Sequence, residues 1–154
     1  MNIISKILFG YHGAGIVFTS DDECLMQLRK HPPVWAFIGG GAKKGESSVD
    51  TALREFYEET GVQLNENDLD VKPLHTLGFG RFRWVLYHCH KDYKIDPTHG
   101  NKAFKEEYVN YKYFHINSYK KELKAEKHKR TFFFVTHQMR LLKKRLGLRN
   151  NKEF

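Results

Sequence analysis

Short runs of apolar residues alternate with polar ones through the first third of the chain. A period of two is typical of a half-buried strand, and the runs at residues 14–18, 24–28 and 35–38 are separated by Ser-Asp-Asp and His-Pro-Pro breaks. We expect these three strands to form a β-meander. The four glycines within residues 39–45 then predict a loop.

The pattern becomes helical after this loop. Ser47 is followed three residues later by Asp50, which is the spacing of a capping pair at the start of a helix. Apolar residues then recur at helical spacing to about Thr60, and Gly61 is well placed to end the helix because glycine readily adopts the left-handed conformation. The sequence therefore predicts a helix from Ser47 to about Thr60.

Three more strands and a second helix are predicted in the rest of the chain. Apolar runs at residues 71–77, 82–90 and 108–114 predict strands, and residues 96–105 predict a loop. Apolar residues at helical spacing predict a C-terminal helix over residues 133–146. The order of strands, helix, strands, helix indicates an α/β (α+β) fold in which helices pack on a mixed β-sheet.

The composition is that of one globular domain over residues 1–154. Hydrophobic residues make up 40% of the chain and charged residues 29%, which suffices for a core, and a second folding unit would leave each half with little core to bury. Cys24 and Cys89 lack the spacing of a zinc site or a disulfide framework, so we expect a cytoplasmic location. No apolar window reaches the length of a membrane span, and we expect neither a targeting segment nor a membrane partner.

Positive charge is concentrated at the C-terminal end. The formal net charge is +8, and residues 118–154 carry twelve Lys or Arg against three Glu. Such a surplus attracts polyanions, so RNA or a phosphate-rich nucleotide is a candidate partner. The alternative is a solvated helix face that only increases solubility.

Three carboxylates share one ridge of the first predicted helix. Each helical residue advances by about 100°, so Glu55, Glu58 and Glu59 fall within an arc of about 100°. Carboxylates at this spacing repel one another, and hard oxygen ligands favour Mg²⁺ or Mn²⁺ as the cation that relieves the repulsion. A neighbouring face, expected to be buried, carries Val49, Ala52, Leu53, Phe56 and Thr60.

The same ridge also allows a plainer interpretation, an exposed helix face with an Arg54–Glu58 ion pair one turn apart. The string GGAKKGESSVDTALREFYEETGV, residues 40–62, argues against it because the string resembles the Nudix box. That box has a glycine, a glutamate and the sequence R-E-U-x-E-E-x-G-U at fixed spacing, where U is aliphatic. Phe56 is the one soft departure. The matching residues are Gly40, Glu46, Arg54, Glu55, Glu58, Glu59, Gly61 and Val62.

The resemblance implies the Nudix fold, a mixed β-sheet sandwiched between α-helices, and a Nudix pyrophosphohydrolase activity. It implies that Glu58 and Glu59 bind the divalent metal, Mg²⁺ or Mn²⁺, and that Glu55 is a further ligand or the base that activates water. The carbonyl of Gly39 often joins such a site. The reaction implied is attack of an activated water on one phosphorus of a diphosphate linkage, without a covalent intermediate.

Other residues of the box are implied in supporting roles. Glu46 and Arg54 would form an orienting pair that fixes the helix against its loop. Lys43 and Lys44 are candidates for phosphate contacts, although surface lysines beside a glycine turn more often serve solubility. We therefore expect the loss of Glu46 or Arg54 to loosen the site.

Two further groups lie outside the box. The stretch FKEEYVNYKYF resembles the acidic segment that supplies another catalytic carboxylate in many family members, with Glu107 the first choice and Glu106 the second; both could instead be solvated loop residues. His88 and His90 flank Cys89, but alternation along a strand places Cys89 on the opposite face. We expect a structural role for these three.

The substrate follows less directly than the reaction. Downstream markers that sort the family into subfamilies do not match here. The first hypothesis is a nucleoside diphosphate linked to another group; the alternatives are a nucleoside triphosphate or the 5′ end or cap of an RNA. A non-catalytic module that senses a nucleotide is the alternative from another class of protein. The resemblance also leaves a homodimer open, because Nudix enzymes often dimerise.

Overall fold

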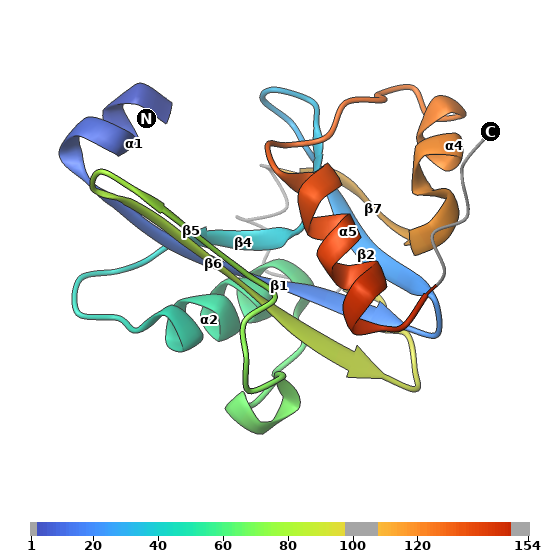
Figure 1. Ribbon diagram of the computed structural model, residues 1–154, viewed down its shortest axis with the longest axis horizontal. Helices are drawn as coiled ribbons and strands as arrows, with labels where there is room; N and C mark the ends of the chain where they lie inside the picture. The colour runs from blue at the N-terminus through green and yellow to red at the C-terminus, as the bar shows by residue number, and fades with distance from the viewer. Residues whose placement is uncertain (1–2, 98–107, 149–154) are drawn as a thin grey trace.

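A seven-stranded sheet and its helices, drawn in Figure 1, make up the part of the chain that the computed structural model describes, residues 3–97 and 108–148. In chain order the elements are α1 (Ile3–Phe9), β1 (Tyr11–Ser20), β2 (Glu23–Arg29), β3 (Trp35–Ala36), β4 (Ile38–Gly41), α2 (Ser48–Thr60), the 3₁₀ helix η1 (Glu66–Asp68), β5 (His75–Phe79), β6 (Phe82–Lys91), β7 (Tyr108–His115), the 3₁₀ helix η3 (Ile116–Ser118), α4 (Tyr119–Lys124) and α5 (Val135–Arg145). None of the helices in this described part combines the length and the apolar character needed to cross a bilayer.

Strand β1 is the centre of the sheet and makes it mixed. It pairs in parallel with β6 over its whole length, from Tyr11 opposite Phe82 to Ser20 opposite Lys91, and antiparallel with β4. Its antiparallel pairing with β2 is confined to Thr19 and Ser20. The predicted β-meander is therefore present only as the antiparallel succession of β1, β2 and β3. Most of β1 lies between β4 and β6 and does not pair with β2.

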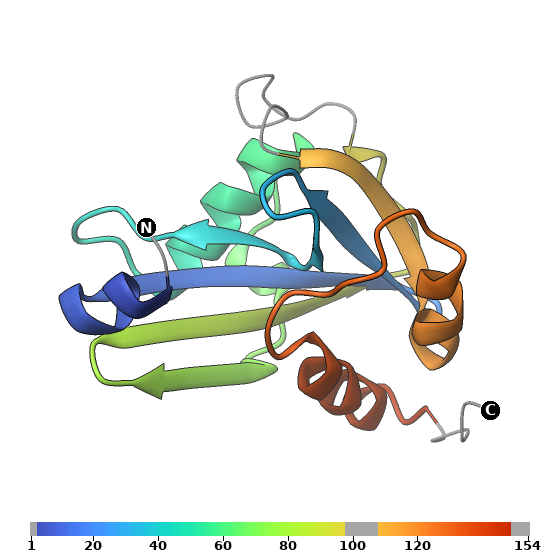
Figure 2. The ribbon, with the colours of Figure 1, turned by 90° about the horizontal axis from the view of Figure 1, so that it is seen from above.

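The two faces of β1 support two separate parts of the core. Ala14, Ile16 and Phe18 pack with α2, whereas Val17 belongs to the cluster that includes Leu142 of α5. This is the alternation of side chains expected of a strand that is covered on both faces. Figure 2 shows α2 and α5 on opposite sides of β1, so the predicted mixed sheet between helices is confirmed.

The predicted strand at residues 35–38 is divided into β3 and β4, and the predicted loop over residues 39–45 begins only after Gly41. The glycines extend β4 because they allow its backbone to lie against that of β1. A Cβ atom at Gly15 would be 2.6 Å from the Ile38 carbonyl oxygen, closer than any real side chain could come. Glycine here thus serves close strand packing, and the prediction of a loop at Gly39 to Gly41 was wrong.

Two other predicted boundaries were wrong. The strand predicted at residues 71–77 starts only at His75, and Val71 is fully exposed. The C-terminal helix starts at Val135 rather than residue 133, because Phe134 has a φ of 67°, a left-handed conformation that an α-helix cannot include. The apolar character of these two segments did not reveal that their first residues lie outside the strand and the helix.

Candidate active site

Helix α2 carries the predicted acidic ridge and begins and ends where the sequence indicated. The Ser47 hydroxyl accepts a hydrogen bond of 3.1 Å from the Asp50 backbone N–H. At the other end Gly61 has a φ of 76°, and its N–H donates to the Tyr57 carbonyl oxygen at 2.8 Å. Both predicted caps are therefore confirmed.

The predicted apolar face of α2 is the face that packs on the sheet. The Phe56 ring lies 6.0 Å from the Phe18 ring of β1, and both side chains are fully buried. Ala52 and Thr60 are buried as well, while Val49 and Leu53 are half-buried against the same cluster. This anchoring fixes the rotation of α2 and hence the direction of its carboxylates.

Arg54 is the centre of a charged network at the start of α2. Its Nε and Nη2 donate to the two carboxylate oxygens of Glu46 at 2.8 and 2.9 Å, the bidentate pairing that favours Arg over Lys. Its Nη1 lies 3.1 Å from Glu55 Oε1 and 3.0 Å from Glu58 Oε2. Nη2 also donates to the Gly41 carbonyl oxygen at 2.9 Å, so one side chain joins the loop, β4 and the acidic ridge.

The predicted contact between Glu46 and Arg54 is present and is reinforced by the loop itself. The hydrogen bond from Arg54, with further bonds from the Lys43 backbone N–H and the Thr51 hydroxyl, holds the pKa of Glu46 down at about 2. Glu46 is therefore ionised at neutral pH. The same contact raises the pKa of Arg54, which stays a cation throughout.

The carboxylate of Glu55 lies directly on the backbone of β4. A Cβ atom on Gly40 would come within 2.4 Å of the Glu55 carboxyl carbon and within 2.5 and 2.7 Å of its oxygens. Glu55 is only 9% exposed and Glu59 only 1% exposed, so the ridge lies against the sheet. The glycine at position 40 is thus required for the place that Glu55 occupies.

In this structure the carboxylates of Glu55 and Glu58 gather on the Arg54 guanidinium. Within residues 3–97 and 108–148, no three His, Cys, Asp or Glu side chains converge closely enough to hold a metal ion between them. The available donors are nonetheless carboxylate oxygens on one helix face beside the backbone of β4, and oxygen is the donor type that Mg²⁺ and Mn²⁺ prefer.

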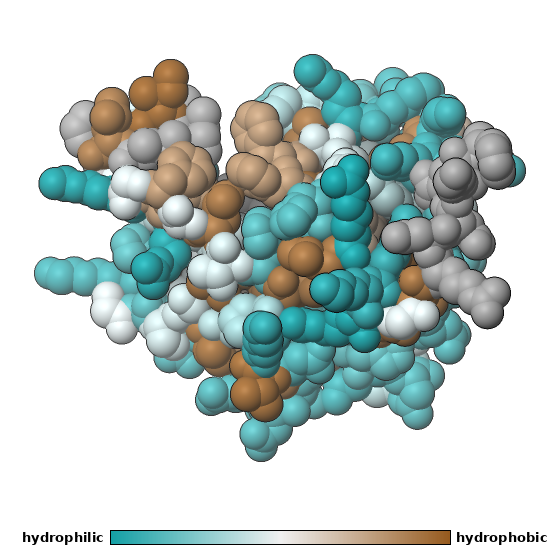
Figure 3. Space-filling view, in the orientation of Figure 1, coloured by the Kyte–Doolittle hydropathy of each residue, from teal (hydrophilic) through white to brown (hydrophobic). Residues whose placement is uncertain are grey.

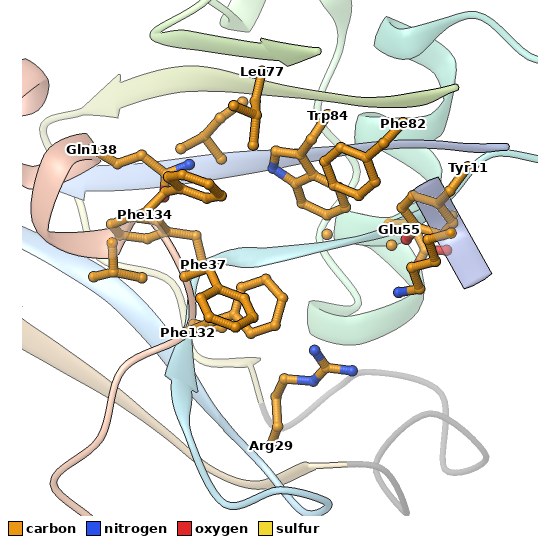
Figure 4. Close-up of a pocket in the computed structure, with 18 of the residues that line it drawn as sticks. Tyr11, Arg29, Phe37, Glu55, Leu77, Phe82, Trp84, Phe132, Phe134 and Gln138 are labelled. Carbon is orange, nitrogen blue, oxygen red and sulfur yellow. The ribbon is translucent and has the colours of Figure 1, made fainter. Parts of the chain in front are cut away.

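A cavity of about 340 Å³ opens beside this network, and Glu55 forms part of its wall. Figure 4 shows Glu55 and Tyr11 at one end and Gln138 and Phe134 at the other, with Trp84 between them. Its aromatic lining comes from Tyr11, Phe37, Phe82, Trp84, Phe132, Phe133 and Phe134. The cavity therefore has one charged end and one aromatic end.

Two cations and a phenol also line the cavity. The Arg29 guanidinium lies 5.4 Å from the centre of the Phe132 ring, and Lys6 Nζ lies 4.2 Å from that of Tyr11. Burial, with the nearby charge of Glu55, raises the pKa of Tyr11 to about 12, so its hydroxyl keeps its proton at neutral pH. These groups suit a negatively charged ligand.

Other residues singled out in the sequence lie elsewhere. Lys43 and Lys44 are exposed and are not part of the described cavity wall. Glu107 and Glu106 lie outside the described residues. The predicted site in turn missed Tyr11, Arg29, Gln27 and the three consecutive phenylalanines before α5. The sequence did contain a signal for the phenylalanines, because three consecutive apolar residues at 132–134 cannot all lie on the one buried face of the helix α5.

The histidines around Cys89 form a separate polar cluster. Both His88 and His90 lie 2.7 Å from the Thr19 hydroxyl, and His88 Nδ1 lies 2.9 Å from Asp70. Burial lowers the pKa of His88. Cys89 faces the α2 side of the core, as alternation predicted, and none of these residues lines the cavity.

Comparison with known proteins agrees with this arrangement. The NUDIX domain model matches residues 12–134. A protein of Bacillus subtilis (strain 168), provisionally named an 8-oxo-dGTP diphosphatase, is 41% identical over 46 residues. That match spans 30% of this chain and only 31% of the Bacillus protein.

Solved structures share the fold at low sequence identity. A MutT NUDIX hydrolase from Burkholderia pseudomallei has a TM-score of 0.65 at 14% identity, over 86% of this chain and 98% of that one. A NUDIX hydrolase from Nitrosomonas europaea has a TM-score of 0.62 at 17% identity, over 93% of both chains.

A bifunctional NMN adenylyltransferase/ADP ribose pyrophosphatase from Francisella tularensis, complexed with AMP and a Mn ion, has a TM-score of 0.64 at 19% identity. It is covered over 42% of its length, against 89% of this chain. With the helix, its caps, the arginine network and a family model that extends from β1 to the residue before α5, the chain belongs to the Nudix domain family.

Proposed function

We propose that this chain is a divalent-metal-dependent hydrolase that cleaves the pyrophosphate bond of a nucleoside diphosphate linked to another group. The observation that carries the proposal is the cavity, which has the Glu55 carboxylate at one end, aromatic walls at the other and the cations Lys6 and Arg29 in its lining. Aromatic faces stack on planar rings, and the charged end suits a diphosphate with its metal. A nucleotide derivative presents both features in one molecule.

The donor set fits a hard cation. We assign Glu58 and Glu59 as ligands, with Glu55 and the Gly39 carbonyl as further candidates. The lack of a side chain at Gly40 supports Glu55 as a candidate, since any Cβ there would displace the Glu55 carboxylate. When bound, Mg²⁺ or Mn²⁺ offsets charge on the phosphate oxygens and makes a water more acidic.

The residues around the metal donors then have distinct tasks. Glu55 takes the proton of the attacking water if it is not itself a ligand. Arg54, held by Glu46, orients Glu55 and Glu58 through the contacts described above. The protonated Tyr11 hydroxyl can donate to a phosphate oxygen. Glu107 is proposed as an additional carboxylate, although it lies outside the described residues.

A second candidate is a nucleoside-triphosphate pyrophosphohydrolase. The name of the Bacillus relative supports it, since a dGTP derivative is such a substrate. Removal of an RNA 5′ end is a third, for which the lysines and arginines of α4 and α5 offer a surface. A salt-sensitive preference for oligonucleotides over mononucleotides would favour the third candidate.

The test is a screen of nucleotide derivatives with Mg²⁺ or Mn²⁺, in which the products show the phosphorus attacked. We expect wild-type turnover that chelation removes, and we expect Glu58→Gln to abolish it with the fold intact by circular dichroism. Glu66→Gln is the matched control, since Glu66 is exposed in η1 and outside the network. If wild type turns over its best substrate no faster than Glu58→Gln, the catalytic proposal fails, and binding without turnover would indicate a nucleotide-sensing module instead.

A further inference from the structure

We propose that Gln27 is a substrate-positioning residue whose side-chain carbonyl oxygen accepts a hydrogen bond from the nucleoside part of the ligand. This inference rests on the proposed function and extends it to specificity. Gln27 lines the cavity and is only 1% exposed. Its Oε1 is buried, and no described residue donates a hydrogen bond to it.

The position of Gln27 places it between the aromatic wall and α2. It is opposite Ala36 of β3 and opposite Tyr111 of β7, and cross-strand partners share one face of a sheet. Ala36 belongs to the cavity wall, and the Tyr111 hydroxyl donates to the Glu59 carbonyl oxygen at 2.9 Å. Gln27 therefore lies in the cavity wall beside the strand that contacts α2.

A second glutamine in the same cavity provides the contrast. Gln138 is also buried, at 6% exposed, but its Nε2 meets His75 Nδ1 at 3.2 Å. The protein thus supplies a partner for the Gln138 amide. A buried amide oxygen without a donor destabilises the folded state, and a methionine would fill the same volume without that cost. A glutamine at position 27 is explained if the donor arrives with the ligand.

The chemistry of the missing donor narrows the ligand group. An ionised diphosphate has no hydrogen to donate, so Oε1 of Gln27 cannot recognise that part of the substrate. A nucleobase N–H and a sugar hydroxyl are both donors. Gln27 therefore reads the nucleoside, whereas the charged end holds the diphosphate.

The test compares wild type with Gln27→Met, using α,β-methylene analogues of guanosine and adenosine diphosphate as non-hydrolysable probes in calorimetry with Mg²⁺. Loss of one neutral hydrogen bond should weaken binding of the preferred probe roughly 3- to 10-fold. Without ligand, the same variant should melt about 3 °C higher, because the unmet carbonyl is gone. Gln138→Met should instead melt lower, and Gln63→Met, at an exposed glutamine outside the described cavity wall, should match wild type.

Two sets of probes locate the donor. One set lacks the 2′- or the 3′-hydroxyl, and the other has a methyl group on a base nitrogen. Wild type should bind one of the altered probes more weakly than the unaltered probe, whereas Gln27→Met should bind both with the same affinity. If wild type binds the probes and Gln27→Met binds and discriminates identically, this inference is overturned while the proposed function stands. If wild type binds no nucleotide probe, the proposed function fails first.

Discussion

The two ends of the cavity are built in different ways. The Arg54 network at the charged end comes from one continuous stretch, β4, the following loop and α2. The aromatic end is assembled from Phe37 between β3 and β4, from β6 and from the segment before α5, which are far apart in the chain. A local sequence motif can thus contain the whole charged network, whereas the aromatic end of the cavity forms only when the whole chain has folded.

The difference also lies in the forces involved. Charge-assisted hydrogen bonds of about 3 Å fix the carboxylates of Glu46 and Glu58 on Arg54, so small displacements there should change the chemical step. Aromatic contacts are less directional and tolerate replacement. We therefore expect changes at the charged end to lower kcat and changes at the aromatic end to raise KM.

The largest effect in this comparison is expected from Gly40→Ala. The new methyl group would lie 2.4 Å from the Glu55 carboxyl carbon, so the flexible Glu55 side chain must move while the fold survives. A displacement of about 1 Å at a reacting group can cost about 100-fold in rate. Steady-state kinetics should show this loss in kcat.

Gly41→Ala is the matched control for that experiment. Its Cβ atom would meet the Tyr11 ring at 3.3 Å, a contact that a small ring movement relieves. It should retain most of the wild-type kcat. Equal losses of kcat in Gly40→Ala and Gly41→Ala would mean that activity depends on the backbone of β4 and not on the position of the Glu55 carboxylate.

An intermediate effect is expected at the aromatic end from Phe133→Ser. Phe133 lines the cavity and is exposed at its mouth, where Figure 3 shows apolar side chains on the loop before α5 facing those of α1. Loss of one stacking contact should raise KM about 2- to 10-fold with kcat nearly unchanged. Tyr93→Ser, at an exposed ring outside the described cavity wall, should leave KM unaltered. A fall in kcat with constant KM would place Phe133 in the chemical step.

The smallest effect concerns stability in acid. Arg54 lowers the pKa of Glu46 from 4.5 to about 2, so the pair stabilises the fold above pH 4.5 and this contribution disappears as the pH falls toward 2. Glu46→Gln should therefore unfold more easily than wild type at pH 7, by up to about 1 kcal/mol. Urea unfolding curves of the two proteins should converge near pH 2. A difference in unfolding free energy between the two proteins that stays constant from pH 7 to pH 2 would contradict the role given to the Glu46–Arg54 pair.

The predictions that succeeded were those that depended on neighbours in the chain. The Ser47 and Gly61 caps and the buried face of α2 follow from helical periodicity and local hydrogen bonds. The predicted loop at Gly39 failed because the role of that glycine depends on Gly15, which is distant in sequence but adjacent in the sheet. Packing between strands is invisible to a local pattern.

The sequence by itself determined the helix α2, its caps and the family, because these depend on spacing within a few turns of the chain. Only the tertiary structure decided that Glu55 rests on Gly40, that Arg54 also contacts Glu55 and the Gly41 carbonyl, and that Gln27 lies buried in an aromatic cavity. The physical reason is that cavities and unmet hydrogen bonds arise where separate elements meet. The residues that line such a cavity are brought together by the topology and register of the sheet, and the order of residues along the chain does not show them directly.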